Sequence, residues 1–195
     1  MVKAAGRPLR ADAERSVRAI LAAAERVLAQ NPGASMEQIA EASGVARTTV
    51  HRRFASRQAL IDALAVSAVR QLAHAIEESR PDSSPALVMM HRATANVIRV
   101  KGAWSFALNL PAMEGSEAAD AWAEIDRRCL ELLDRARREG VIDADADLGW
   151  VARVFYALLG EAVHNRPETD PLDPDALAAR IVDTLLHGAA PRGSR

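Results

Sequence analysis

Apolar residues recur at three- and four-residue spacing along almost the whole chain, and short breaks at Pro, Gly, Ser or Asp separate the periodic segments. This spacing gathers apolar side chains on one face of an α-helix. No segment alternates with period two in β-branched residues, so no sheet is expected. The sequence predicts an all-α fold of about nine helices. The predicted helices span residues 12–30, 36–42, 47–54, 56–79, 85–100, 116–139, 147–163 and 173–188, with a short apolar segment over 102–110.

Several predicted helices carry end signals. Ser35 followed three residues later by Gln38 has the pattern of a capping box. Gly44 and Gly140 stand where a helix ends, and glycine is the residue that most easily takes the left-handed conformation found there. Pro174 follows an aspartate and suits the first position of a helix.

The distribution of charge divides the chain into a small basic part and a larger acidic one. Residues 1–57 hold ten Lys/Arg and five Asp/Glu, whereas the remaining residues hold 15 and 21. A basic head on an acidic body is typical of a protein whose head meets a polyanion, although a solvated basic face gives the same count. We therefore expect one domain over residues 1–57, a second over residues 58–188 and a disordered tail over 189–195.

Composition narrows the class of protein. Hydrophobic residues make up 49% of the chain and charged residues 26%, as in soluble globular proteins. No apolar run approaches the ~18 residues of a membrane span, and the basic N-terminus lacks the apolar core of a secretory signal. Cys129 is the only cysteine and can form no disulfide within the chain. These features predict a cytoplasmic protein with no membrane association.

The stretch from Ser35 to Arg57 has the organisation of a helix-turn-helix. Two helices too short to be stable alone flank Gly44, which can take the positive φ of a tight turn, and Val45 can fill the gap between them. The outward face of the second helix then offers hydrogen-bond donors, a methyl group and positive charge, which suit the major groove of DNA. That face consists of Arg47, Thr48, His51 and Arg52. A helical hairpin with a solvated basic face remains an alternative on these residues alone.

The same segment resembles the TetR family of bacterial transcription regulators. Three elements fall in register: the Ala-Ser-Gly-Val turn at 42–45, the Thr-Val-His-Arg-Arg-Phe run at 49–54 and the Ser-Arg-Gln-Ala-Leu run at 56–60. The resemblance covers about residues 12–64, and beyond them it is architectural only. It implies a sequence-specific regulator of transcription, a repressor that a small-molecule effector releases from a double-stranded DNA operator.

The resemblance also implies roles for individual residues. Arg47 and Thr48 match positions that face base edges, Thr49 and His51 match contacts to the backbone or groove wall, and Arg57 matches a phosphate contact. The predicted DNA-binding set is Ser35, Arg47, Thr48, Thr49, His51, Arg52, Arg53 and Arg57, with Arg7 and Arg10 of the N-terminal arm as further phosphate contacts.

Two positions depart from the family pattern. His51 stands where tyrosine is usual, and a histidine reaches less far toward a phosphate. Ala46 stands where serine or threonine is usual, so the recognition helix lacks a side-chain N-cap. Both departures leave the operator sequence unpredicted.

Aromatic and methionine residues concentrate in the larger part of the chain, where they could line an apolar cavity with adaptable walls. On the residues alone, the core of an all-α domain is the favoured explanation, whereas the resemblance implies an effector pocket between these helices. The predicted pocket residues are Met89, Met90, His91, Thr94, Trp104, Phe106, Asn109, Met113, Trp122, Ile125 and Cys129.

The last two long helices are expected to form a homodimer interface, because two helices from each subunit can pair into a four-helix bundle. Two-fold symmetry would place two recognition helices ~34 Å apart, or a multiple of that distance. The predicted interface residues are Leu148, Val151, Phe155, Leu158, Ala162, Leu177, Ile181 and Leu185.

An enzyme is the main alternative class, but the sequence lacks a nucleophile elbow, a phosphate-binding glycine loop and a His-Glu-x-x-His motif. Asp143, Asp145 and Asp147 imitate the start of a calcium loop, but Val154 stands where a bidentate glutamate is needed. No catalytic residue, cofactor or metal is therefore predicted. A scaffold that binds no DNA is a third class, which a salt-dependent DNA-binding assay would separate.

Overall fold

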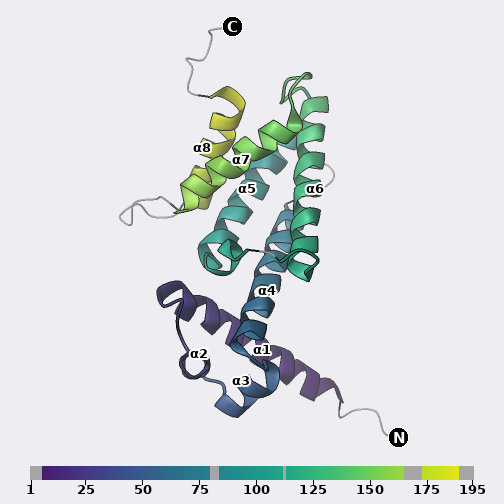
Figure 1. Cartoon of the computed structure of the whole chain (residues 1–195). Helices are drawn as coiled ribbons and strands as arrows, with labels where there is room; N and C mark the ends of the chain where they lie inside the picture. The colour runs from purple at the N-terminus through teal and green to yellow at the C-terminus, as the bar shows by residue number, and fades with distance from the viewer. Residues whose placement is uncertain (1–5, 80–83, 112, 165–172, 189–195) are drawn as a thin grey trace, which may run out of the picture. The chain divides into compact units, whose positions relative to one another are not determined.

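The computed structural model describes residues 6–79, 84–111, 113–164 and 173–188, with side chains from Asp12 onward (Figure 1). The described residues contain helices and no strand, which confirms the all-α class. The elements are α1 (Gly6–Gln30), α2 (Met36–Ser43), α3 (Arg47–Arg53), α4 (Arg57–Glu78), α5 (Ala86–Ala103), the 3₁₀ helix η1 (Ala107–Asn109), α6 (Glu117–Arg138), α7 (Leu148–His164) and α8 (Pro174–His187). The tail predicted over 189–195 lies outside the described residues.

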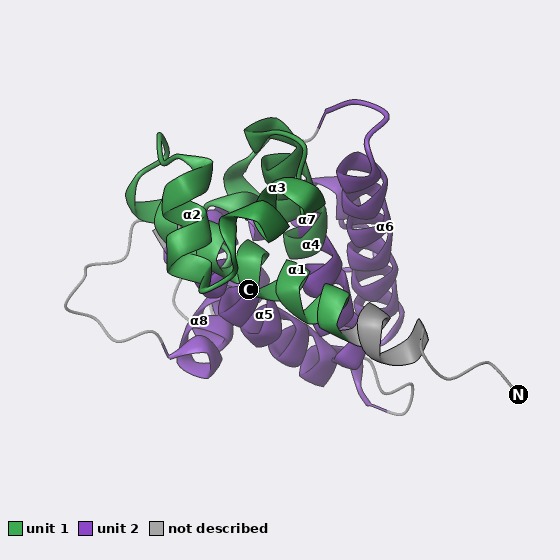
Figure 2. Cartoon of the chain, turned by 90° about the horizontal axis from the view of Figure 1, so that it is seen from below, with its two compact units in different colours: residues 1–68, 104–112 green, residues 69–103, 113–195 purple. Residues whose placement is uncertain are grey.

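The chain divides into two compact units (Figure 2). The first comprises residues 1–68 and 104–112, and the second comprises residues 69–103 and 113–195. The division falls within α4, so this one helix contributes its first part to one unit and its last part to the other. Each unit has its own buried core.

The core of the first unit forms around one face of α1. One face of α1 packs on α2, and buried side chains of α3 and α4 complete the core. Because α2 and α3 are too short to be stable alone, they depend on this burial. The buried residues include Ile20, Leu21, Ala24, Leu28, Ile39, Val50, Phe54, Leu60 and Leu64.

A buried carboxylate of α1 holds the segment 104–112 within the first unit. Glu25 is 5% exposed. Its two carboxylate oxygens accept hydrogen bonds from the backbone N–H groups of Phe106 (2.7 Å) and Ala107 (3.0 Å). These donors lie at the start of η1, where no helical carbonyl is available to them. Burial raises the pKa of Glu25 above its ordinary value, although the two hydrogen bonds act in the opposite direction.

In the second unit, α5 packs on α6, α7 and α8, and α7 packs on α6 and α8. Asp173 and Ser116 cap α8 and α6 by accepting backbone N–H groups, as short polar side chains at helix starts commonly do. Asp147 likewise accepts the N–H of Trp150 at the start of α7. One core cluster comprises Ala86, Met90, Leu133, Ala136, Ile142, Ala152 and Val182.

Among the described helices, α4 is long and apolar enough to cross a membrane on length and composition alone. A core helix of a soluble protein passes the same test. Its residues Leu60, Leu64, Ala68, Val69 and Leu72 are each buried, so at least one face of the helix is occupied by protein.

Candidate nucleic-acid interface and ligand cavity

The start of α2 is fixed by the predicted capping box. The Ser35 hydroxyl accepts the backbone N–H of Gln38 at 3.3 Å, and the Gln38 side-chain oxygen accepts the backbone N–H of Ser35 at 2.8 Å. Two backbone donors that α2 cannot satisfy internally are thereby paired. This arrangement sets the direction in which α2 leaves the preceding loop.

The turn between α2 and α3 depends on Gly44, which adopts φ +67° and ends α2 in the left-handed conformation. A side chain at this position would be strained by the backbone conformation rather than by crowding. Ala46 precedes α3 and makes no side-chain cap hydrogen bond, as its departure from the family pattern predicted. The tight turn that joins α2 to α3 therefore requires glycine at position 44.

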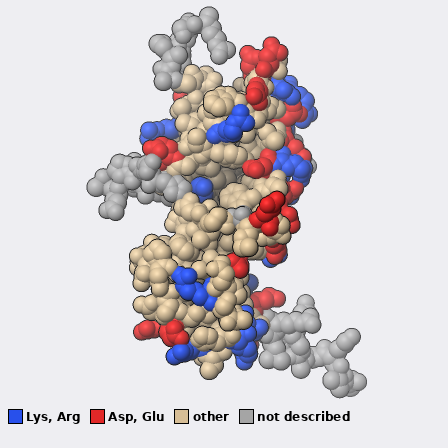
Figure 3. Space-filling model, viewed as in Figure 1, with Lys and Arg blue, Asp and Glu red and all other residues tan. Residues whose placement is uncertain are grey.

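The outward face of α3 is basic and accessible. Val50 and Phe54 are buried and anchor the helix to its unit. The side chains of Arg47, Thr48, His51, Arg52 and Arg53 are exposed, and Thr49 is half-buried. Figure 3 shows Lys and Arg side chains at the surface of this unit, in the lower part of the view. Donors and positive charge thus gather where a DNA groove could receive them.

An acidic residue of α2 lies beside this face. Glu37 Oε1 is 2.6 Å from a guanidinium nitrogen of Arg47 and 3.6 Å from Nε2 of His51. The pKa of Glu37 lies below its ordinary value because a backbone N–H and the nearby Arg47 both stabilise the carboxylate. This contact could not be predicted from the sequence, since nothing in the spacing of residues 37 and 47 shows how α2 and α3 cross.

Arg57, at the start of α4, contacts the loop before α2. Its Nε donates to the carbonyl of Ala34 at 3.1 Å, and a terminal nitrogen donates to the carbonyl of Pro32. Its guanidinium therefore stabilises this loop. The resemblance implied a phosphate contact for Arg57 and did not imply this contact within the protein. The side chains of Arg7 and Arg10 lie outside those described.

The second unit contains a cavity of about 370 Å³ between α4, α5, α6 and α7. Most of its wall is apolar, and the volume suits a small organic molecule. It is lined by Leu72, Ile76, Met90, Ala93, Thr94, Val97, Lys101, Trp122, Ile125, Asp126, Arg128, Cys129, Leu132, Leu133, Phe155, Tyr156 and Leu159.

Polar groups of the cavity wall are few. The hydroxyl of Tyr156 donates to the Asp126 carboxylate at 2.9 Å, and that of Thr94 donates to the backbone carbonyl of Met90 at 2.7 Å. Burial raises the pKa of the Tyr156 hydroxyl and of the Cys129 thiol, so both stay protonated near neutral pH. An inert thiol of this kind packs as a small apolar group.

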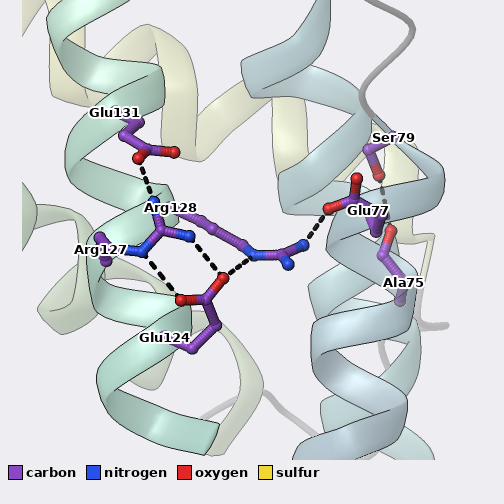
Figure 4. Close-up of polar contacts among 7 residues, drawn as sticks. All are labelled: Ala75, Glu77, Ser79, Glu124, Arg127, Arg128 and Glu131. Atoms are coloured by element: carbon purple, nitrogen blue, oxygen red, sulfur yellow. Dashed lines mark hydrogen bonds and ion pairs between the residues drawn. The ribbon is translucent and has the colours of Figure 1, made fainter.

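Arg128 connects the cavity wall to α4 through ion pairs (Figure 4). Its guanidinium contacts Glu77 on α4 and, at 2.6 Å, Glu124 on its own helix. Glu124 also accepts hydrogen bonds from Arg127. The two arginines lower the pKa of Glu124 to about 2. A second ion pair, Arg70 with Glu117, also joins α4 to α6.

Five of the eleven predicted pocket residues line this cavity: Met90, Thr94, Trp122, Ile125 and Cys129. The other six do not. Trp104, Phe106 and Asn109 belong to the first unit, where Glu25 holds their segment. Met113 is 71% exposed, Met89 is buried, and His91 is half-buried outside the cavity lining.

The cavity also includes residues that were not predicted. Lys101 continues the α5 stripe of Met90, Thr94 and Val97 and could have been found from that spacing. The sequence gives no sign that three other residues line the cavity, because charged or polar residues on a helix are usually solvated. These residues are Asp126, Arg128 and Tyr156.

The predicted dimer residues divide between the interior and the surface of the second unit. Phe155 lines the cavity, Ile181 is buried, and Leu148, Val151 and Leu185 pack against the core cluster. Leu158, Ala162 and Leu177 are half-buried. Trp150 on α7, which was not predicted, is 59% exposed, and Arg153 stacks over its ring at 5.4 Å.

Comparison with known proteins agrees with the helix-turn-helix geometry. Residues 20–64 match the family described as "Bacterial regulatory proteins, tetR family". The chain is 36% identical over 148 residues to the HTH-type transcriptional repressor LfrR of Mycolicibacterium smegmatis, a match that covers 75% of this chain and 76% of LfrR. The chain belongs to the TetR family. It is therefore a DNA-binding transcription regulator and not an enzyme.

Solved structures extend the similarity of this TetR-family regulator to the second unit. The crystal structure of LfrR in complex with proflavine superposes with a TM-score of 0.72 at 30% identity, covering 91% of this chain and 98% of that one. The regulator PfmR from Thermus thermophilus gives a TM-score of 0.75 at 16% identity, covering 88% of this chain and 99% of that one. At that identity, PfmR shares the fold alone.

Proposed function

We propose that this regulator is a repressor, that the exposed face of α3 binds its operator, and that a small molecule in the cavity of the second unit releases it. The observation that carries the proposal is the set of basic and hydroxyl side chains that α3 exposes after the Gly44 turn, on a helix anchored by Val50 and Phe54. Operator binding in the cytoplasm follows from this role.

Sequence preference would come mainly from the start of α3. Arg47 can donate two hydrogen bonds to one guanine, and the Thr48 methyl can contact a thymine. His51, Thr49 and Arg53 would contact the backbone or the groove wall, with Arg52 and Ser35 beside them. Such phosphate contacts make binding fall steeply with added salt. The arm residues Arg7 and Arg10 are proposed as further phosphate contacts.

We expect a homodimer, because a symmetric pair of α3 helices would recognise a palindromic operator. The accessible part of α7 and α8 is the proposed contact. Leu158, Ala162 and Leu177 remain candidates, and Trp150 joins them because a large exposed aromatic is typical of an interface centre. Trp150→Ser should shift the protein toward monomer in analytical ultracentrifugation, and an unchanged sedimentation profile would exclude this surface.

The cavity is the proposed effector site. LfrR, the 36% identical relative, has been crystallised with proflavine, a planar aromatic molecule, and an apolar cavity of about 370 Å³ can hold a molecule of that size. Effector binding would act through α4, because Leu72 and Ile76 line the cavity while Arg57 begins the same helix beside the DNA-binding helices. A ligand changes DNA affinity only if it binds one conformation better than the other.

The test has two parts. Operators selected from a random duplex library by the wild-type protein are first compared with those selected by Arg47→Ala, and we expect the variant to accept substitutions at a guanine that the wild type requires. A failure of the wild-type protein to enrich any sequence would overturn the proposal.

The second part concerns release. A compound library is screened for molecules that dissociate the selected duplex from the protein, and Ala93→Phe, which fills the cavity, should bind the duplex yet no longer respond. Release that persists in Ala93→Phe would place the effector elsewhere. Arg92→Ala, on the exposed side of the same helix, is the matched control.

A further inference from the structure

Three charged residues line the cavity: Lys101, Asp126 and Arg128. Two of them already have polar partners. Arg128 contacts Glu77 and Glu124, so two carboxylates surround its charge. Asp126 accepts the hydroxyl of Tyr156 and is exposed, so water and a hydrogen bond both stabilise the carboxylate. Neither group requires a ligand to balance its charge.

Lys101 differs from both. It lies in the last turn of α5 and is half-buried, and no hydrogen bond or ion pair joins it to any residue that the structure describes. Burial lowers the pKa of its ammonium group below the ordinary value. Removing a cation from water without a partner is unfavourable, and a bound anion would reverse that cost.

The rest of the wall determines what must accompany the anion. Leu72 and Ile76 from α4, Val97 from α5, and Trp122 and Ile125 from α6 offer apolar contact. A small inorganic anion would leave this surface unfilled. The molecule that satisfies both features has an apolar body and one anionic group.

We propose that the effector of this regulator is an amphipathic organic anion, such as an aromatic or aliphatic carboxylate or sulfonate, whose charged group pairs with Lys101 while its apolar body fills the cavity. The inference rests on the proposed effector site and narrows it to one ligand class. It differs from a simple transfer of the ligand of LfrR, because proflavine is a cation near neutral pH, and a cation in this cavity would have to pair with Asp126.

Three fluorescent probes of similar ring size but different charge test the proposal. They are 1-anilinonaphthalene-8-sulfonate, an anion; N-phenyl-1-naphthylamine, its neutral counterpart; and proflavine. We expect the full-length protein to bind the sulfonate more tightly than the neutral amine. Lys101→Met should weaken sulfonate binding by roughly tenfold or more, the size of a lost charged hydrogen bond, and leave the neutral amine unchanged.

Two variants control this result. Lys101→Arg keeps the charge and should retain the preference for the sulfonate, which separates the ion pair from a folding defect. Arg92→Met removes an exposed charge from the same helix and should change none of the three affinities. Circular dichroism checks that every variant keeps its helix content.

The outcomes distinguish this inference from the function on which it rests. Equal sulfonate binding by wild type and Lys101→Met, or tighter binding of proflavine than of the sulfonate, would overturn the anionic ligand while leaving the effector cavity intact. If neither the sulfonate nor the neutral amine binds, or if both bind Ala93→Phe as well as they bind the wild type, the cavity is not the ligand site. The anionic ligand and the effector site then both fail.

Discussion

The carboxylate of Glu37 lies 2.6 Å from the guanidinium of Arg47, so α2 pairs with the first residue of α3 across the turn that joins them. Both side chains are largely exposed, and exposed ion pairs are weak because water and salt screen them. A base or phosphate can therefore displace Glu37 from Arg47. The same carboxylate nevertheless places negative charge beside the proposed DNA-binding face, where it would repel a phosphate.

Replacing Glu37 by Gln should therefore increase DNA affinity. The substitution removes the repulsive charge and frees Arg47, and we expect tighter binding to the selected operator by a few-fold at low salt, with the gain shrinking as salt rises. Fluorescence anisotropy with a labelled duplex measures the affinity and its dependence on salt concentration. Glu41→Gln, on the same helix, is the matched control and should change affinity less. Weaker binding by Glu37→Gln would show that the ion pair orients Arg47 for recognition, and equal binding would show that the Glu37 charge does not oppose DNA binding.

Arg57 should contribute to stability as well as to DNA binding, because its guanidinium donates to the carbonyls of Ala34 and Pro32. Arg57→Ala should lower the free energy of unfolding by about 1–3 kcal/mol, the range for hydrogen bonds from charged groups. The same substitution should weaken binding to every duplex, whatever its sequence, by about the same factor. Urea titration measures the first effect and anisotropy the second.

Two comparisons separate these effects. Arg53→Ala removes an exposed arginine nearby and should weaken DNA binding without a comparable loss of stability. Arg57→Lys keeps the charge but lacks the forked geometry that reaches two carbonyls, so it should be destabilised while retaining part of the DNA affinity. Unchanged stability of Arg57→Ala would mean that the loop holds its conformation without this contact.

Helix positions could be predicted from the sequence because the signals that end helices are local. Ser35 with Gln38, and Gly44 with its positive φ, act through neighbours a few residues away. The start of α1 shows the limit of this method: the helix begins at Gly6 rather than at residue 12. Helix-forming residues can extend a helix past its apolar stripe, and the periodic pattern does not record that extension.

The composition of the cavity could be predicted only in part, because aromatic content does not specify which element a side chain faces. The concentration of aromatic and methionine residues in the larger part of the chain predicts that Trp104 and Phe106 line the pocket. Their segment instead belongs to the first unit, where the buried carboxylate of Glu25 binds it. A contact between residues so far apart in sequence follows from tertiary packing, and neither spacing nor composition predicts it.

Gly44 should be a position where alanine is unfavourable even though space is available. Apart from Gly44 itself and its two chain neighbours, no described atom lies within 4 Å of the Cβ that alanine would add, but the residue has φ +67°. The left-handed conformation costs an ordinary residue about 1–2 kcal/mol, so Gly44→Ala should be destabilised by that amount. Gly160→Ala is the control: it also has free space, lies within α7, and should gain up to about 1 kcal/mol. Urea unfolding of both variants checks the difference in sign.

Glu25 gives a prediction for the pH dependence of stability. Its pKa in the folded protein is raised above the ordinary value near 4.5, chiefly by burial. The native state therefore binds a proton more readily than the unfolded chain in the pH range just above 4.5. Within that range stability should fall as pH rises, and the contribution of this residue is complete only below about pH 4.5.

Glu25→Gln should remove that pH dependence, because the amide does not ionise. It should also lower overall stability by about 1–3 kcal/mol, since one amide oxygen cannot replace two carboxylate oxygens that accept the N–H groups of Phe106 and Ala107. Thermal unfolding followed by circular dichroism between pH 4 and pH 7 measures both effects. Glu14→Gln, an exposed position of the same helix, controls for the lost charge. A variant with the same pH slope as wild type would show that another group is responsible, because only an ionisable side chain can link proton binding to unfolding.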